Sequence, residues 1–322
     1  MRAPALTLGV LGLTFLLALP LAIALRGMIE EHLGASLEAD RAAAEWHAGW
    51  AAEFGAQAQG LGRTFTHEIL GFGGTLANVS GLLERRELNP TLAGAIVAYV
   101  AAWIFLSGGL LDRLARGRPI RTAAFFSACG VYFVRFLRLA VVIGAVYWAL
   151  FRWLHPFLLT TTYDRLTRDL TEERKGLLIR GGLYLAFVAA LAVVNLIADF
   201  AKVRAVVEDR RSMLGALGAS VRFVRRRPLR VLALYVLNVL AVLVILRLWL
   251  QVAPGAATPS WWALFAAQLY LLFRVWARLS FMASEIVFFQ GELAHADYAA
   301  APEPLWPDSP GVEAIQNLTR QN

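Results

Sequence analysis

Five charged residues lie in or beside strongly apolar stretches of the chain, where ionisable side chains are costly and commonly functional. Asp112 and Asp199 each end an apolar segment, whereas Arg274, Arg278 and Glu285 lie within or just after another. Charges of opposite sign in such surroundings form buried ion pairs or line a polar pathway. We therefore predict an intramembrane polar cluster of these five residues, in which the arginines pair with the aspartates.

Helix geometry motivates this pairing. Counted from Trp261 at about 1.5 Å per residue, Arg274 lies roughly 20 Å and Arg278 roughly 25 Å into an apolar core about 30 Å thick. By the same count Asp112 and Asp199 end their segments at about 30 Å. An arginine that points inward would close this gap. Arg278 has an alternative, which is to extend to the cytoplasmic headgroups.

The composition identifies the elements that must hold these residues as membrane helices. Of the 322 residues, 58% are hydrophobic and the mean hydropathy is positive, which excludes an ordinary soluble protein. Spanning a bilayer takes about 20 apolar residues in a helix. We predict an all-α polytopic bundle of about six transmembrane helices, at 5–25, 91–111, 139–155, 177–199, 230–251 and 261–284. The first is longer than the apolar region of most cleaved signal peptides, so we favour an uncleaved span over that alternative.

The basic residues orient these helices. Segment 112–138 contains six arginines and segment 199–230 contains nine lysines and arginines, whereas 253–260 contains none. Because cytoplasmic loops are enriched in Lys and Arg, both termini are expected in the cytoplasm. We accordingly expect a multi-pass protein of a bacterial inner membrane, with residues 26–90 on the extracytoplasmic side.

The second basic segment has a finer pattern. Apolar residues recur at helical spacing from 203 to 224 with arginines largely between them, and Pro228 marks a break. This pattern predicts an amphipathic helix on the cytoplasmic leaflet that binds anionic headgroups. The predicted headgroup contacts are Arg204, Arg211, Arg222, Arg225, Arg226 and Arg227. No nucleic-acid-binding motif accompanies the charge, so we expect no nucleic-acid partner.

The two basic segments also resemble each other. A shift of 90 positions places "RTAAFFSACGVYFVRFLRL" (121–139) over "RSMLGALGASVRFVRRRPL" (211–229), with "FVR" in register. We interpret the bundle 91–290 as containing a parallel internal repeat, about 91–159 and 177–252, with an amphipathic elbow helix in each copy. Convergence of two Ala- and Arg-rich elbows is the alternative.

An Asp-ending span followed by "AKVRAVVEDRRS" and an amphipathic segment resembles a diffuse group of uncharacterised bacterial six-helix membrane proteins. It is also distantly similar to the membrane domain beside some glycerophosphodiester phosphodiesterases. The resemblance covers about 91–295 and implies a helical membrane fold, without catalytic residues.

The predicted extracytoplasmic segment 26–90 carries Trp46, Trp50 and Phe54 on one helical face, as expected for a helix packed on the bundle or in the headgroup zone. Residues 69–83 are apolar but too short for a simple span, so they form either an interfacial helix or a re-entrant hairpin. The histidines here lack metal-ligand spacing, and we expect no metal site at His32, His47 and His67.

The Pro-rich acidic tail 291–322 is expected in the cytoplasm. It either folds back on the basic segments or docks a partner through Trp306.

The chain has no GxxxxGK[ST], HExxH or GxSxG motif, and we expect neither catalytic residues nor a cofactor. We predict a non-enzymatic scaffold, assembly or regulatory protein that contacts anionic lipid or protein partners. The alternative is a small-solute or lipid transporter with polar groups facing a pathway; a membrane-embedded enzyme ranks third. The pathway candidates are Asn195, Asn238, Gln268 and Arg274.

Overall fold

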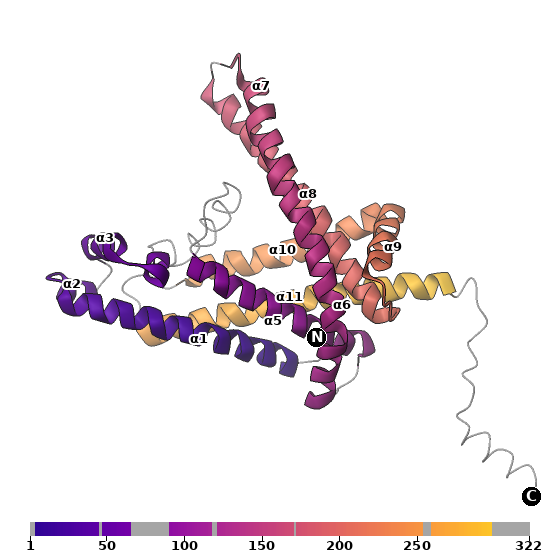
Figure 1. The fold of residues 1–322 in the computed structure, drawn as a ribbon, viewed down its shortest axis with the longest axis horizontal. Coiled ribbons are helices and arrows are strands. Elements are labelled where there is room, and N and C mark those ends of the chain that lie inside the picture. The colour runs from indigo at the N-terminus through magenta and orange to yellow at the C-terminus, as the bar shows by residue number, and fades with distance from the viewer. Residues whose placement is uncertain are drawn as a thin grey trace, which may run out of the picture. The chain divides into compact units, whose positions relative to one another are not determined.

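A computed structural model describes residues 4–44, 47–65, 90–117, 121–170, 172–253 and 259–297 (Figure 1). These residues are almost entirely helical, and no strand occurs among them. The chain divides into two compact units, residues 1–286 and 287–322. Trp46, His67, segment 69–83 and residues 298–322 of the predicted tail, with Trp306, lie outside the described residues, whereas 291–297 form the end of helix α11 (Ser260–Asp297).

Five helices are long and apolar enough to cross a membrane, as expected for a multi-pass membrane protein. They are α1 (Pro4–Ala35), α5 (Pro90–Arg116), α6 (Thr122–Ala149) with its continuation, α8 (Glu173–Val207) and α10 (Pro228–Val252). The sixth predicted span lies in α11 (Ser260–Asp297), which is longer but is not among the five. Its apolar stretch is diluted by Gln268, Arg274 and Arg278.

Helix α6 differs from the predicted elbow and span. It continues through two π-helical segments, Leu150–Leu154 and Phe157–Thr162, into α7 (Tyr163–Thr167), so that one helix runs over 46 residues. The matching copy breaks between α9 (Met213–Arg226) and α10. Pro228 begins α10, where its missing N–H costs nothing, whereas the matching residue Arg138 allows α6 to continue.

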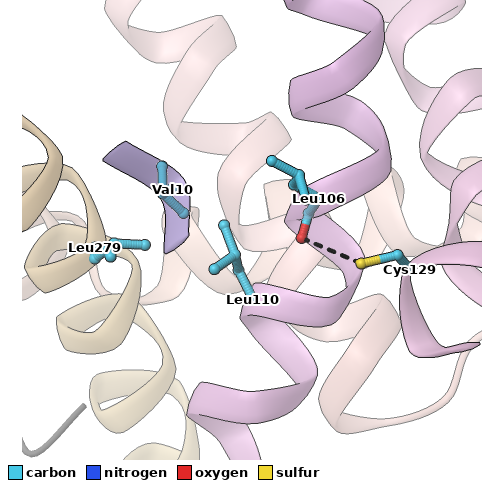
Figure 2. Packing of buried hydrophobic residues seen from close by; sticks show 5 residues of the cluster. All are labelled: Val10, Leu106, Leu110, Cys129 and Leu279. Carbon is cyan, nitrogen blue, oxygen red and sulfur yellow. Dashed lines mark hydrogen bonds between the residues drawn. The ribbon is translucent and has the colours of Figure 1, made fainter. Parts of the chain in front are cut away.

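The main core joins α1, α5, α6 and α11. Figure 2 shows its fully packed members, which are Val10, Leu106, Leu110, Cys129 and Leu279. Gly108 and Gly109 bring α5 and α6 together, because a Cβ on Gly109 would lie 2.5 Å from the Cys129 sulfur. Two consecutive glycines therefore permit the closest helix contact in this core.

The segment after α1 folds into α2 (Ala39–Ala44), α3 (Ala48–Gln57) and a 3-10 turn (Gly60–Thr64). Trp50 and Phe54 lie on one face of α3, as predicted, and pack against Ile29 and Leu33 of α1. This small cluster therefore covers the last turns of the first helix.

Two predicted surface histidines have structural roles here. His47 caps α3 by accepting a hydrogen bond at Nδ1 from the Trp50 N–H, 3.2 Å away. His32 of α1 packs edge-on against the Phe54 ring at 5.2 Å. Among the described residues, no group of three His, Cys, Asp or Glu side chains is arranged to hold a metal ion.

Candidate functional site: a polar cluster between three helices

Four ionisable side chains meet where α8, α10 and α11 approach one another. We call Asp199, Lys202, Tyr235 and Glu285 the Tyr235 cluster. The Tyr235 oxygen lies 2.7 Å from Glu285 Oε1 and 3.3 Å from Asp199 Oδ2. Asp199 Oδ1 in turn lies 2.5 Å from Lys202 Nζ. The four side chains form one continuous chain of polar contacts across three helices.

Helices α10 and α11 run antiparallel and position this cluster. Near one end Trp249 stacks on Tyr270, with ring centroids 4.5 Å apart. Near the other, Tyr235 meets Phe281 edge-on at 4.7 Å. Between Tyr235 and Trp249 the two helices therefore share about 21 Å of length, at about 1.5 Å per residue.

A second polar contact lies one helical turn from Tyr235. The Asn238 side chain donates to the Leu234 carbonyl at 2.8 Å and to the Ser284 hydroxyl oxygen at 3.1 Å. Ser284 itself donates to the Phe281 carbonyl at 2.7 Å. The Asn238–Ser284 bond joins α10 to α11, next to the residues Tyr235 and Glu285, and the two bonds within the helices orient its partners.

The cluster is closed on one side and open on the other. Glu285 is 2% exposed, and the described residues give it no ion pair. The Asp199 side chain is 16% exposed and that of Lys202 29%. The ion pair thus lies at the more accessible side, while the carboxyl group of Glu285 is buried.

The structure brings two of the five predicted cluster residues together. Asp199 and Glu285 meet through Tyr235, whereas buried Asp112 accepts a hydrogen bond from Arg116 Nε at 2.9 Å. Arg278 is stacked on the Trp103 ring, with 3.5 Å between Cζ and the ring centroid.

The two arginines of α11 do not pair with the aspartates in the described part of the chain. Arg278 Nη1 donates to the Tyr99 hydroxyl at 3.2 Å, and the Arg274 guanidinium lies over the Tyr270 ring at 5.6 Å. Side chains of a helix lean toward its N-terminus. Because the N-terminus of α11 lies at the opposite end from Asp199, this lean favours the contacts with Tyr99 and Tyr270 over a pair with that carboxylate.

The predicted surface helix 203–224 differs from what is observed. Residues 203–207 are the last turns of α8, and α9 begins only at Met213, with Ser212 accepting the Gly215 N–H at 3.2 Å as its cap. The apolar face of α9 packs on α8, where Phe200 and Phe223 have centroids 5.2 Å apart. That face is therefore covered by protein and not by lipid.

The six arginines predicted to contact headgroups divide into two groups. Arg204 is paired with Glu208 at 3.1 Å, and Arg227 lies over the Phe223 ring at 5.3 Å. The other four are exposed: Arg211, Arg222, Arg225 and Arg226.

The turn between α8 and α9 is tied to α6. Asp209 adopts a left-handed conformation, with φ of 44°, and its Oδ1 accepts a hydrogen bond from Arg135 Nη1 at 2.7 Å. This bond holds the pKa of the Asp209 carboxyl below its ordinary value. Arg135 thereby joins the two copies of the predicted repeat.

Sequence reasoning missed Lys202, Tyr235 and Ser284 as members of this site. Two signals were present. Lys202 is one of only two lysines and lies three residues after Asp199. Tyr235 precedes Asn238 by three residues in the otherwise apolar stretch 231–246 of α10. Asn238, a candidate for the transport pathway, donates to Ser284 of the neighbouring helix.

No known protein family, curated protein or solved structure matches this chain.

Proposed function

We propose that this protein is a non-enzymatic membrane scaffold that assembles with partner helices and is held by anionic lipid at its basic side. This proposal rests on how few residues are buried in three of the apolar helices. In the most apolar 18-residue stretch of each helix, 6% of the residues are buried in α1, α8 and α10, against 39% in α5. Most residues in the apolar stretches of these three helices are thus half-buried or exposed, and are available to lipid or to other helices.

A six-span topology with α11 as the last span fits this role. Because α10 and α11 run antiparallel through Trp249–Tyr270 and Tyr235–Phe281, a membrane that contains α10 also contains this part of α11. With the Arg-rich turns inside, both termini are cytoplasmic. Helix α9 then lies at the cytoplasmic surface, with Arg222, Arg225 and Arg226 toward the headgroups.

Photo-crosslinking in native membranes tests the scaffold. A photoreactive amino acid replaces Leu185 of α8 or Leu237 of α10, which are 70% and 66% exposed. Ala201, which is 0% exposed on α8, is the matched control position. The proposal expects protein adducts of defined mass from the exposed positions and none from the control. The scaffold proposal would be excluded if the exposed positions gave only lipid adducts and if the protein in nanodiscs had the mass of a single copy.

Transport is the second candidate, because the Tyr235 cluster places polar groups on α8, α10 and α11. If proteoliposomes take up a solute and Tyr235→Phe abolishes this uptake, transport is favoured. If vesicles with and without the protein leak the solute equally, the scaffold is favoured.

A further inference from the structure

The Tyr235 cluster has more hydrogen-bond acceptors than protons. A tyrosine hydroxyl carries one proton, yet its oxygen lies within hydrogen-bonding distance of two carboxyl groups, Glu285 at 2.7 Å and Asp199 at 3.3 Å. If both carboxyl groups were ionised, Tyr235 would donate to one of them and present lone pairs to the other. One additional proton removes this conflict.

Burial and pairing decide which carboxyl group carries that proton. Asp199 lies 2.5 Å from the Lys202 ammonium and is partly exposed, so its charge is compensated. Glu285 is 2% exposed and, among the described residues, has no cation at ion-pair distance. A carboxyl group so placed favours its neutral form, because burial penalises the charge.

With Glu285 neutral, each of the four side chains in the Tyr235 cluster has a hydrogen-bond partner. The Glu285 O–H donates to the Tyr235 oxygen, the Tyr235 O–H donates to Asp199 Oδ2, and Lys202 donates to Asp199 Oδ1. The cluster then carries one negative and one positive charge, in contact with each other. Each of the three polar contacts in the Tyr235 cluster then joins a donor to an acceptor.

Two further groups, one on α11 and one on α6, lie within electrostatic range of the cluster. Arg278 of α11 is close enough to act electrostatically on Asp199 and Lys202, although its guanidinium bonds to Tyr99 of α5. Tyr147 of α6 is within electrostatic range of Asp199 and Lys202. Neither forms an ion pair with Glu285 in the described part of the chain. Lys202 also acts electrostatically on Glu285, but its ammonium is in contact with Asp199.

We propose that Asp199, Tyr235 and Glu285 form a proton-binding site, which holds one proton on Glu285 at neutral pH and couples α8, α10 and α11 to it. Release sends the proton through Tyr235 and Asp199 to water at the exposed side of Lys202. It leaves a second carboxylate sealed beside the first, without a cation of its own. Repulsion between them then loosens α11 from α8 and α10. The proton site is independent of the scaffold function proposed above.

Infrared spectroscopy of the full-length protein in nanodiscs tests the site. At neutral pH we expect a carbonyl stretch of a protonated carboxylic acid, which disappears when the sample is titrated to alkaline pH. Glu285→Gln should abolish this band, and the exposed control Glu30→Gln should leave it unchanged. Tyr235→Phe should shift the band to higher frequency, because the acid loses its hydrogen-bond acceptor. A wild-type spectrum without the band, or a band that survives Glu285→Gln, overturns the proposal.

The pH dependence of stability gives a second readout. A proton held more tightly by the native than by the unfolded chain makes stability fall as pH rises through the native titration. The wild-type thermal midpoint should therefore decrease on the alkaline side, and Glu285→Gln, which mimics the protonated acid, should reduce that decrease. Equal slopes in wild type and Glu285→Gln would contradict a proton site at Glu285, even if both proteins fold.

Discussion

Gly109 of α5 and Cys129 of α6 lie so close that a methyl group on the glycine would lie 2.5 Å from the thiol sulfur and 2.9 Å from the Phe125 carbonyl oxygen. Real Cβ atoms do not approach other atoms at such distances, and the carbonyl belongs to helix backbone that cannot rotate away. The α5–α6 contact therefore depends on the absence of a side chain at this position.

We expect Gly109→Ala to lower the free energy of unfolding by about 1–3 kcal/mol, the usual cost of overpacking. Gly94→Ala is the control on the same helix, because its Cβ meets nothing within 4 Å. Alanine at that position should be neutral or stabilise by up to about 1 kcal/mol through helix propensity. Thermal midpoints in detergent measure both changes. Equal midpoints for the two variants would mean that α5 and α6 are not this close.

A second prediction concerns the position that distinguishes the two copies of the repeat. Arg138 lies inside the continuous helix α6, and Pro228 occupies the matching position at the start of α10. Arg138→Pro removes a backbone hydrogen bond and should cost about 3 kcal/mol or more. Pro228→Ala should change stability little, since the first helical residue needs no donor. Similar losses from both changes would contradict the assigned helix boundaries.

Of the six spans predicted from hydrophobic length, five correspond to helices that are long and apolar enough to cross a membrane, because an apolar run is recognised without knowledge of its neighbours. Hydrophobic length did not show that α6 continues where α9 stops, although Pro228 against Arg138 was visible in the alignment of the two copies. Contacts such as Tyr235 with Glu285, 50 residues apart, depend on which faces of α10 and α11 meet. Such contacts depend on how helices pack against one another, and the spacing of residues along one helix does not determine this packing.

A third prediction separates true from apparent partners. Tyr235→Phe and Glu285→Gln alter one hydrogen-bonded pair, so their effects on stability should deviate from additivity by about 0.5–3 kcal/mol. Arg274→Ala and Asp199→Ala should instead add to within about 0.5 kcal/mol, because Arg274 lies over Tyr270 and Asp199 contacts Lys202. Double-mutant cycles from denaturant unfolding in mixed micelles measure both couplings. A large coupling for Arg274 and Asp199 would restore the arginine–aspartate pair expected from the sequence.

A fourth prediction is pH dependence at the turn after α8. Arg135 holds the pKa of the Asp209 carboxyl below its ordinary value through their hydrogen bond. A carboxyl group with a lowered native pKa contributes stability above its unfolded pKa and loses it as pH falls through the native value. The side chain of Asp209 is 70% exposed, so the contribution should stay below about 1 kcal/mol.

Arg135→Gln should therefore lower the thermal midpoint slightly at neutral pH, and the difference from wild type should vanish in acid. Arg225→Gln, at the matching position of the other copy, is the control because Arg225 is exposed and forms no such bond in the described part of the chain. If the difference in thermal midpoint between Arg135→Gln and wild type grew in acid, the ion pair would not stabilise the protein in the way proposed.

The last prediction concerns the exposed arginines of α9. Arg222, Arg225 and Arg226 project from the helix whose other face is packed on α8, so that they are free to meet lipid phosphates. Near an anionic leaflet each contributes about 1 kcal/mol. The triple change to glutamine should thus weaken binding of anionic lipid by up to about 3 kcal/mol, which is roughly 100-fold.

The measurement is the rise in thermal midpoint when anionic lipid is added to the protein in neutral micelles. For the wild type this rise should shrink with salt. The control replaces three exposed arginines in or just after the C-terminal part of the continuous helix α6–α7, which are Arg152, Arg165 and Arg168, and removes the same net charge. Equal loss of the lipid response in both triple variants would mean that total charge, and not the face of α9, binds the lipid.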